Sequence, residues 1–165
     1  GNRDNDILDM ALVEGYAEYN GIPFYSANGE GLTDIGNFEC AARDQRWEFL
    51  NRVANKVGSK VVVTAHHKND LIETFFIRSV LRGVPVKDSV MKRFFSRNGL
   101  VRYKPFLHLT KDEMYKIAKR YNIPFNEDET NTDTAYDRNF IRHDIMPALM
   151  KRRNILKTIP KSLEV

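Results

Sequence analysis

The chain has 165 residues, of which 42% are hydrophobic, and it carries one cysteine and a formal net charge of +4. This length and apolar content fit one globular domain with a single buried core. One cysteine excludes an intrachain disulfide and a cysteine-ligated cluster, and no stretch approaches the roughly 20 apolar residues of a membrane helix. The sequence therefore predicts a soluble, cytoplasmic protein with no membrane partner.

Charge is unevenly distributed along the chain. Residues 1–50 hold 3 basic and 10 acidic side chains, and residues 51–165 hold 23 and 12, so the net charges are −7 and +11. A basic region of this size can attract the phosphate backbone of a nucleic acid, although a solvated basic surface has the same composition.

The first part of the chain predicts a helix, a short strand and a loop. Apolar residues recur at helical spacing over residues 7–19, and Gly21 follows as a stop signal. Residues 22–25 suggest a short strand, and the glycine-rich run 28–36 suggests a loop.

The middle of the chain alternates helical and extended patterns. A long helix is expected from Phe38 to Gly58, followed by a buried strand over residues 60–65 and an amphipathic helix over residues 71–81. Residues 84–99 show little periodicity, so they predict a long mobile loop.

Two further elements follow this loop. A strand is expected near residues 100–103, and Thr110 with Glu113 matches a capping box at the start of another helix. Strands that alternate with helices indicate a layered α/β domain with a mostly parallel sheet.

The first candidate site is the stretch 64–74, which runs from the end of the buried strand into a helix. Ligands bind at the carboxyl ends of strands in open parallel sheets. Asp70 and Glu73 are three residues apart, so both carboxylates face one side of a helix and could hold an ammonium group or a metal ion. His66 could bind a phosphate or shuttle a proton. Alternatively, the carboxylates complement the helix N-terminus and His66 and His67 are turn residues; no third ligand supports a zinc site.

The second candidate site joins an acidic loop, residues 127–133, to a basic helix start. Arg138 and Arg142 are four residues apart, so a helix projects both from one face, where they could grip phosphates. An internal salt-bridge cluster between loop and helix is the alternative.

The third candidate site is the pair Arg43 and Arg46 in the long second helix. Exposed arginines usually only solubilise a helix, and the neighbouring Trp47 is expected in the core.

Together, these segments resemble the N-type ATP pyrophosphatase domain of the tRNA(Ile)-lysidine synthetase family, within the PP-loop superfamily. The resemblance covers roughly residues 36–150, and its most specific parts are residues 65–74, 126–131 and 136–143. Weaker similarities lie at residues 41–47 and 102–107. The resemblance implies a Rossmann-like fold of the adenine nucleotide alpha hydrolase type, with a partial pyrophosphatase domain over residues 1–150 and a basic extension over residues 151–165.

The resemblance also implies an activity. Enzymes of this family adenylate the wobble cytidine of tRNA(Ile) with a CAU anticodon and then join L-lysine to it, using ATP and Mg²⁺. Arg46 and His66 would then contact ATP or the adenylated intermediate, and Asp70 and Glu73 would bind the lysine. The resemblance assigns four basic residues to tRNA: Arg138, Arg142, Lys92 and Arg93.

One part of the family pattern has no counterpart in this sequence. The Ser-Gly-Gly-x-Asp-Ser loop that holds pyrophosphate is absent, as are the first strand and its helix. We therefore expect a chain truncated at its N-terminus or completed by a separate polypeptide that carries the PP-loop.

Other families fit less well. The related tRNA 2-thiolation enzymes need more cysteines, and pyrophosphatases that amidate small molecules lack the paired motifs at residues 126–131 and 138–143. The main alternative is a non-catalytic tRNA-binding remnant, or one piece of a split enzyme, that has lost ATP turnover.

Overall fold

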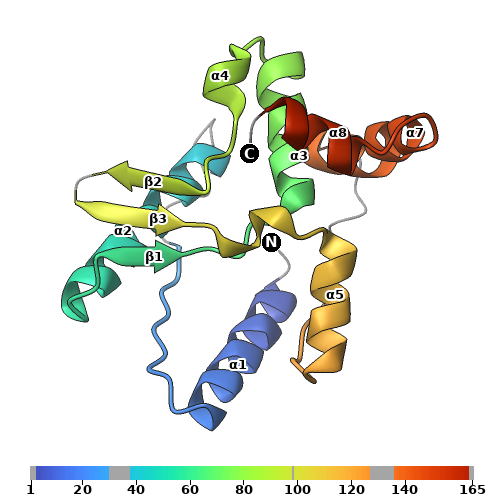
Figure 1. The fold of residues 1–165 in the computed structure, drawn as a ribbon. Helices are drawn as coiled ribbons and strands as arrows, with labels where there is room; N and C mark the ends of the chain where they lie inside the picture. Colours follow the sequence, from blue (N-terminus) through green and yellow to red (C-terminus); the bar gives the residue numbers. More distant parts are fainter. Residues whose placement is uncertain (1–2, 30–37, 98, 127–135, 164–165) are drawn as a thin grey trace. The chain divides into compact units, whose positions relative to one another are not determined.

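The computed structural model describes residues 3–29, 38–97, 99–126 and 136–163 (Figure 1). The α-helices of the described residues are α1 (Arg3–Tyr19), α2 (Phe38–Lys56), α3 (Lys68–Phe75), α4 (Val86–Ser89), α5 (Lys111–Arg120), α6 (Asp137–Phe140), α7 (Met146–Met150) and α8 (Ile155–Ser162). The strands are β1 (Val61–Val63), β2 (Phe94–Arg97) and β3 (Leu100–Tyr103). Two π-helical segments, η1 (Phe76–Leu81) and η4 (Ile141–Ile145), and the 3₁₀ turn η2 (Pro105–His108) complete the order.

The two long N-terminal helices end where the sequence predicts. Gly21 follows α1 with a φ of +66°, and Gly58 follows α2 with a φ of +68°. Both glycines take the left-handed conformation that closes a helix and that disfavours other residues. The prediction of a strand at residues 22–25 is wrong, because this segment has no regular secondary structure. Pro23 lacks the backbone N–H that a strand ladder requires.

The sheet has three strands in the order β1-β3-β2. Val101 donates to the Lys60 carbonyl and Thr64 donates to the Tyr103 carbonyl, so β1 and β3 run parallel (Figure 1). The pair β2–β3 is an antiparallel hairpin, so the described sheet is mixed, whereas the sequence predicts a mostly parallel one.

The burial of β1 also differs from the prediction. Only Val62 of the three valines is buried, at 8% exposure, whereas Val61 and Val63 are 45% and 57% exposed. The side chains of a strand alternate between its two faces, so a single covered face buries every second residue.

The prediction of a long mobile loop at residues 84–99 is wrong. This segment contains α4 and β2, and the buried Ser89 hydroxyl donates to the carbonyls of Val84 and Pro85 at 3.1 and 3.2 Å. These contacts close a helical turn that apolar periodicity cannot reveal, because the helix is too short to show a repeat.

The chain forms two compact units, one of residues 1–62 with 96–101 and the other of residues 63–95 with 102–165. The core of the first unit contains Ala54, Val62 and Leu100, with Trp47 packed against it as the sequence predicts. Across the described residues, none of the helices combines the length and hydrophobicity needed to span a bilayer.

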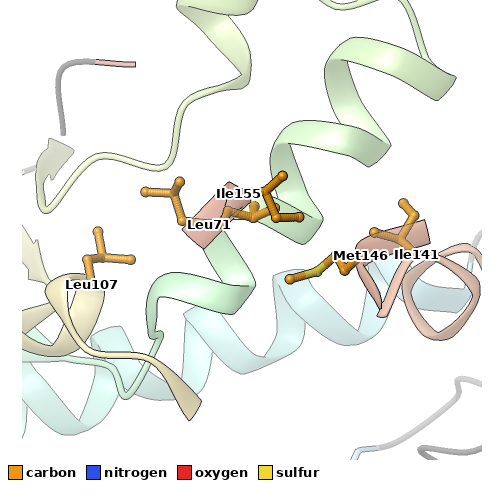
Figure 2. Packing of buried hydrophobic residues seen from close by; sticks show 6 residues of the cluster. Leu71, Leu107, Ile141, Met146 and Ile155 are labelled. Carbon is orange, nitrogen blue, oxygen red and sulfur yellow. The ribbon is translucent and has the colours of Figure 1, made fainter. Parts of the chain in front are cut away.

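The core of the second unit gathers residues from α3, η2 and the C-terminal helices. Figure 2 shows this cluster with labels on Leu71, Leu107, Ile141, Met146 and Ile155. Burying each such side chain contributes about 1.5–3 kcal/mol, so this core fixes α3 against the segment that follows residue 136. Ile155 belongs to this core, although the sequence predicts only a basic extension beyond residue 150.

Candidate functional site

The start of α3 is held by bonds to the start of α5, within the second unit. The Lys68 amide donates to the Leu109 carbonyl at 2.7 Å, and the Lys111 amide donates to the Asn69 side-chain oxygen at 3.0 Å. No local sequence pattern predicts this role of Asn69, because its partner lies 42 residues away. These bonds place the turn that contains His66 and His67.

His67 and Asp70 cap the N-terminus of α3. The Asp70 carboxylate accepts from the His67 amide at 2.8 Å, and His67 Nδ1 accepts from the Asp70 amide at 3.4 Å. This reciprocal arrangement is a capping box with histidine as the cap. Part of the alternative interpretation is therefore correct, since Asp70 does satisfy the helix N-terminus, and its side chain still remains 14% exposed.

His66 is half-buried beside this cap. Its Nδ1 lies 2.9 Å from the Thr64 hydroxyl. Burial lowers the pKa of His66 below its ordinary value of 6.5, and the positive charges of Lys104 and Arg138 lower it further, while Asp70 opposes them. The neutral form of His66 therefore predominates at pH 7, and this form can accept a proton.

Glu73 is fully buried and is bound by Arg142. Arg142 Nε donates to Glu73 Oε1 at 2.8 Å, and a terminal nitrogen of the same guanidinium donates to Oε2 at 3.0 Å. The hydrogen bonds to Glu73 raise the pKa of Arg142. This bidentate pair joins α3 to η4 and neutralises a carboxylate that has no access to water.

Arg138 lies on the same side of its helix as Arg142, as the four-residue spacing predicts. Its Nε is 3.8 Å from Glu73 Oε2, and its side chain is 45% exposed, compared with 20% for Arg142. Arg138 therefore keeps a solvent-facing guanidinium, whereas most of Arg142 is engaged with Glu73.

The two carboxylates of α3 thus have different environments. The spacing predicts that Asp70 and Glu73 share an open face, but Glu73 is paired and closed off from solvent. On the same helix, the Thr74 hydroxyl is buried without a hydrogen-bond partner among the described residues. Sequence spacing could not reveal the Glu73–Arg142 pair, because its members are 69 residues apart.

Lys92 and Arg93 immediately precede β2, and both are exposed. A terminal nitrogen of Arg93 donates to the Tyr103 hydroxyl at 3.3 Å, and Lys104 Nζ donates to the Lys92 carbonyl at 3.2 Å. These two bonds connect Lys92 and Arg93 to residues 103 and 104, within the second unit.

Arg43 and Arg46 are exposed on α2, which belongs to the first unit. The acidic loop at residues 127–133 lies outside the described residues. Within the described ranges, no three His, Cys, Asp or Glu side chains gather in a way that could hold a metal ion.

A comparison with protein families identifies the domain. The model of the PP-loop domain matches residues 3–149, and this range contains every site residue predicted above. The chain belongs to the PP-loop domain family. ATP binding is the property that this domain implies.

Relatives confirm the resemblance seen in the sequence. The tRNA(Ile)-lysidine synthase of Pseudothermotoga lettingae is 34% identical over 89% of this chain and 33% of its own length. The proteins of the same name from Thermotoga maritima and Thermus thermophilus are 42% and 34% identical, over 70% and 92% of this chain and 27% and 30% of their own lengths. The chain spans about a third of the length of these relatives.

Proposed function

We propose that this chain contributes the lysine and tRNA sites of an ATP-dependent tRNA(Ile)-lysidine synthase. The single observation that carries the proposal is the first two turns of α3, where a partly exposed carboxylate, Asp70, lies beside a neutral histidine, His66, and a buried Glu73–Arg142 pair. This combination suits a cationic amine that must lose a proton before it attacks.

Asp70 makes the direct contact with the substrate lysine in this proposal. Its carboxylate is 14% exposed and reachable, whereas the carboxylate of Glu73 is fully buried. Glu73 takes part in lysine binding indirectly, because its carboxylate holds the Arg142 guanidinium in place and balances its charge. Glu73 contacts the ammonium directly only if Arg142 moves away. A charge-assisted hydrogen bond from lysine to Asp70 contributes roughly 1.5–3 kcal/mol.

His66 and Arg46 serve the two chemical steps. In the first step, the C2 oxygen of the cytidine attacks the α-phosphate of ATP and pyrophosphate leaves, and Arg46 stabilises the charge that develops on phosphate. In the second step, neutral His66 accepts a proton from the lysine ammonium, the resulting amine forms a C–N bond at C2, and the C2–O bond to AMP breaks.

The basic residues Arg138, Arg142, Lys92 and Arg93 face the tRNA. The exposed guanidinium of Arg138 is the best placed of the first two to hold a phosphate, because Arg142 is already bound to Glu73. In this proposal, Mg²⁺ arrives with the ATP phosphates.

The Ser-Gly-Gly-x-Asp-Ser motif that the family uses to hold pyrophosphate does not occur in these 165 residues. A non-catalytic tRNA-binding piece of a split enzyme is the second candidate function. Binding of ATP to the chain together with a polypeptide that carries the phosphate loop separates the two, because a binder without turnover has no need of ATP.

The deciding experiment is ATP-dependent incorporation of labelled lysine into a tRNA(Ile) transcript with a CAU anticodon. A transcript with a GAU anticodon serves as the matched control. Incorporation confined to the CAU transcript supports the synthase. No incorporation, either by the chain or after a polypeptide with the phosphate loop is added, contradicts it.

A further inference from the structure

A large basic hollow lies in the second unit, on residues that the proposed chemistry leaves unused except for Lys92 and Arg93. We call it the basic groove and define it by the six cations that line it: Lys68, Lys87, Lys92, Arg93, Lys157 and Lys161. They come from the start of α3, from α4, from the approach to β2 and from α8.

The basic groove is electrostatically one-sided. Neither aspartate nor glutamate is present among its lining residues, and none of its six cations forms an ion pair with a described carboxylate. Lys157 and Lys161 are four residues apart on α8, so they project from one face of that helix. Six cations that line one hollow can attract a chain of phosphates, because binding releases the counterions around them.

The size of the basic groove favours a polymer. Its volume is about 1080 Å³, which slightly exceeds the roughly 300–1,000 Å³ that small-molecule sites occupy. A single metabolite would leave several of its cations without a partner. A strand with a phosphate at every residue can engage all of them.

Phe94 adds an aromatic surface to this lining. Its ring stacks on Tyr103 with a centroid distance of 4.6 Å and an interplanar angle of 7°, and 59% of the residue remains exposed. The Arg93 guanidinium lies 5.9 Å from the centre of the Phe94 ring. An exposed ring that another ring supports on one face can stack with an unpaired base on its other face. The bases of a duplex already stack on each other.

We propose that the basic groove binds a single-stranded segment of RNA, with its phosphates along the lysines and one base stacked on Phe94. This rests on the proposed function, because the substrate named there is an RNA. It adds the position of the strand, the part of the RNA that binds and a residue, Phe94, that recognises a base.

The test is fluorescence anisotropy of the full chain with a short labelled RNA that lacks self-complementarity, without ATP or lysine. The same RNA annealed to its complement is the duplex probe. Wild-type protein should bind the single strand more tightly than the duplex. Replacing Phe94 with leucine should weaken single-strand binding roughly 5- to 150-fold and remove this preference, and the Phe94→Tyr variant should retain both.

The phosphate contacts are tested by salt dependence. The double variant Lys157→Gln/Lys161→Gln should reduce the slope of log affinity against log salt by about 1.4, since each single-strand phosphate contact contributes about 0.7. The control Lys116→Gln/Lys119→Gln removes two charges from α5, outside the basic groove, and should leave the slope nearly unchanged.

Equal slopes for the two double variants, or equal binding of both probes by wild-type protein, would overturn the proposal. A circular dichroism spectrum like that of wild type confirms that each variant is folded. Because neither ATP nor lysine is present, RNA binding by the groove and failure of lysine incorporation can be told apart.

Discussion

Arg142 donates to both carboxylate oxygens of the fully buried Glu73, at 2.8 and 3.0 Å, across 69 residues of chain. This pair connects α3, which carries Asp70, to the π-helical segment that follows Arg138. π-Helical turns are rare and recur at functional sites, which agrees with a place for this segment in the proposed active centre. The pair also makes the stability of the second unit depend on a charge balance.

The first prediction concerns this charge balance. Arg142→Met should lower the free energy of unfolding by about 3 kcal/mol, because it leaves the buried Glu73 carboxylate with only the longer 3.8 Å contact to Arg138. Urea denaturation followed by circular dichroism measures the change. The double variant Glu73→Leu/Arg142→Met should recover most of the loss, since an apolar pair needs no charge compensation. Additive losses in the double variant would show that the pair is not coupled.

The second prediction concerns Asp70. Asp70→Asn should raise the lysine concentration required for half-maximal incorporation by roughly 10- to 100-fold, because a charge-assisted hydrogen bond contributes about 1.5–3 kcal/mol. Asparagine retains an oxygen that can accept from the His67 amide, so α3 should keep its cap. The affinity for tRNA, measured by filter binding in a complete enzyme, should be nearly unchanged. Equal losses in lysine and tRNA binding would contradict the assignment of Asp70 to the lysine site. Asp112→Asn on α5 is the control.

The third prediction concerns pH. Burial lowers the pKa of His66, so the unfolded chain binds a proton that the folded chain resists. The contribution of His66 to stability is therefore fully present above the ordinary pKa of 6.5 and is lost as pH falls towards the lowered value. Unfolding free energies measured from pH 8 downward should fall less steeply below about 6.5 in His66→Asn than in wild type. The same slope in both proteins would mean that His66 is not the group responsible.

The fourth prediction concerns Arg138. Arg138→Ala should weaken tRNA binding and reduce the slope of log affinity against log salt by about 1, as expected for one phosphate contact. Stability should change little, because Arg142 still neutralises Glu73. An unchanged slope would assign Arg138 a structural role, and Lys119→Ala provides the comparison for loss of one exposed charge.

The fifth prediction concerns the cap of α5. The Thr110 hydroxyl accepts from the Glu113 amide at 3.2 Å, and the Glu113 carboxylate accepts from the Thr110 amide at 2.7 Å. Thr110→Ala should cost about 1 kcal/mol of stability in urea denaturation. Thr158→Ala removes an exposed hydroxyl that caps no helix and should change stability by less than about 0.5 kcal/mol. Equal effects of the two substitutions would show that the capping box contributes nothing.

Local signals in the sequence determined several elements of this protein. The capping box at Thr110 and the glycines at positions 21 and 58 act on neighbouring backbone groups, so the pattern and the structure agree at these places. The four-residue spacing of Arg138 and Arg142 likewise placed them on one side of a helix, because helical geometry is local. The family motifs could also be recognised in the sequence, and the match of the PP-loop domain over residues 3–149 agrees with them.

Only the tertiary structure decided which of these groups are available to a ligand. It paired Glu73 with Arg142, left Asp70 partly exposed, and made residues 94–97 a strand by pairing them with β3. It also gathered lysines from α3, α4 and α8 into one groove. Burial, ion pairing and strand pairing each require a partner distant in the sequence, and periodicity and spacing report only on neighbours within a few turns of the chain.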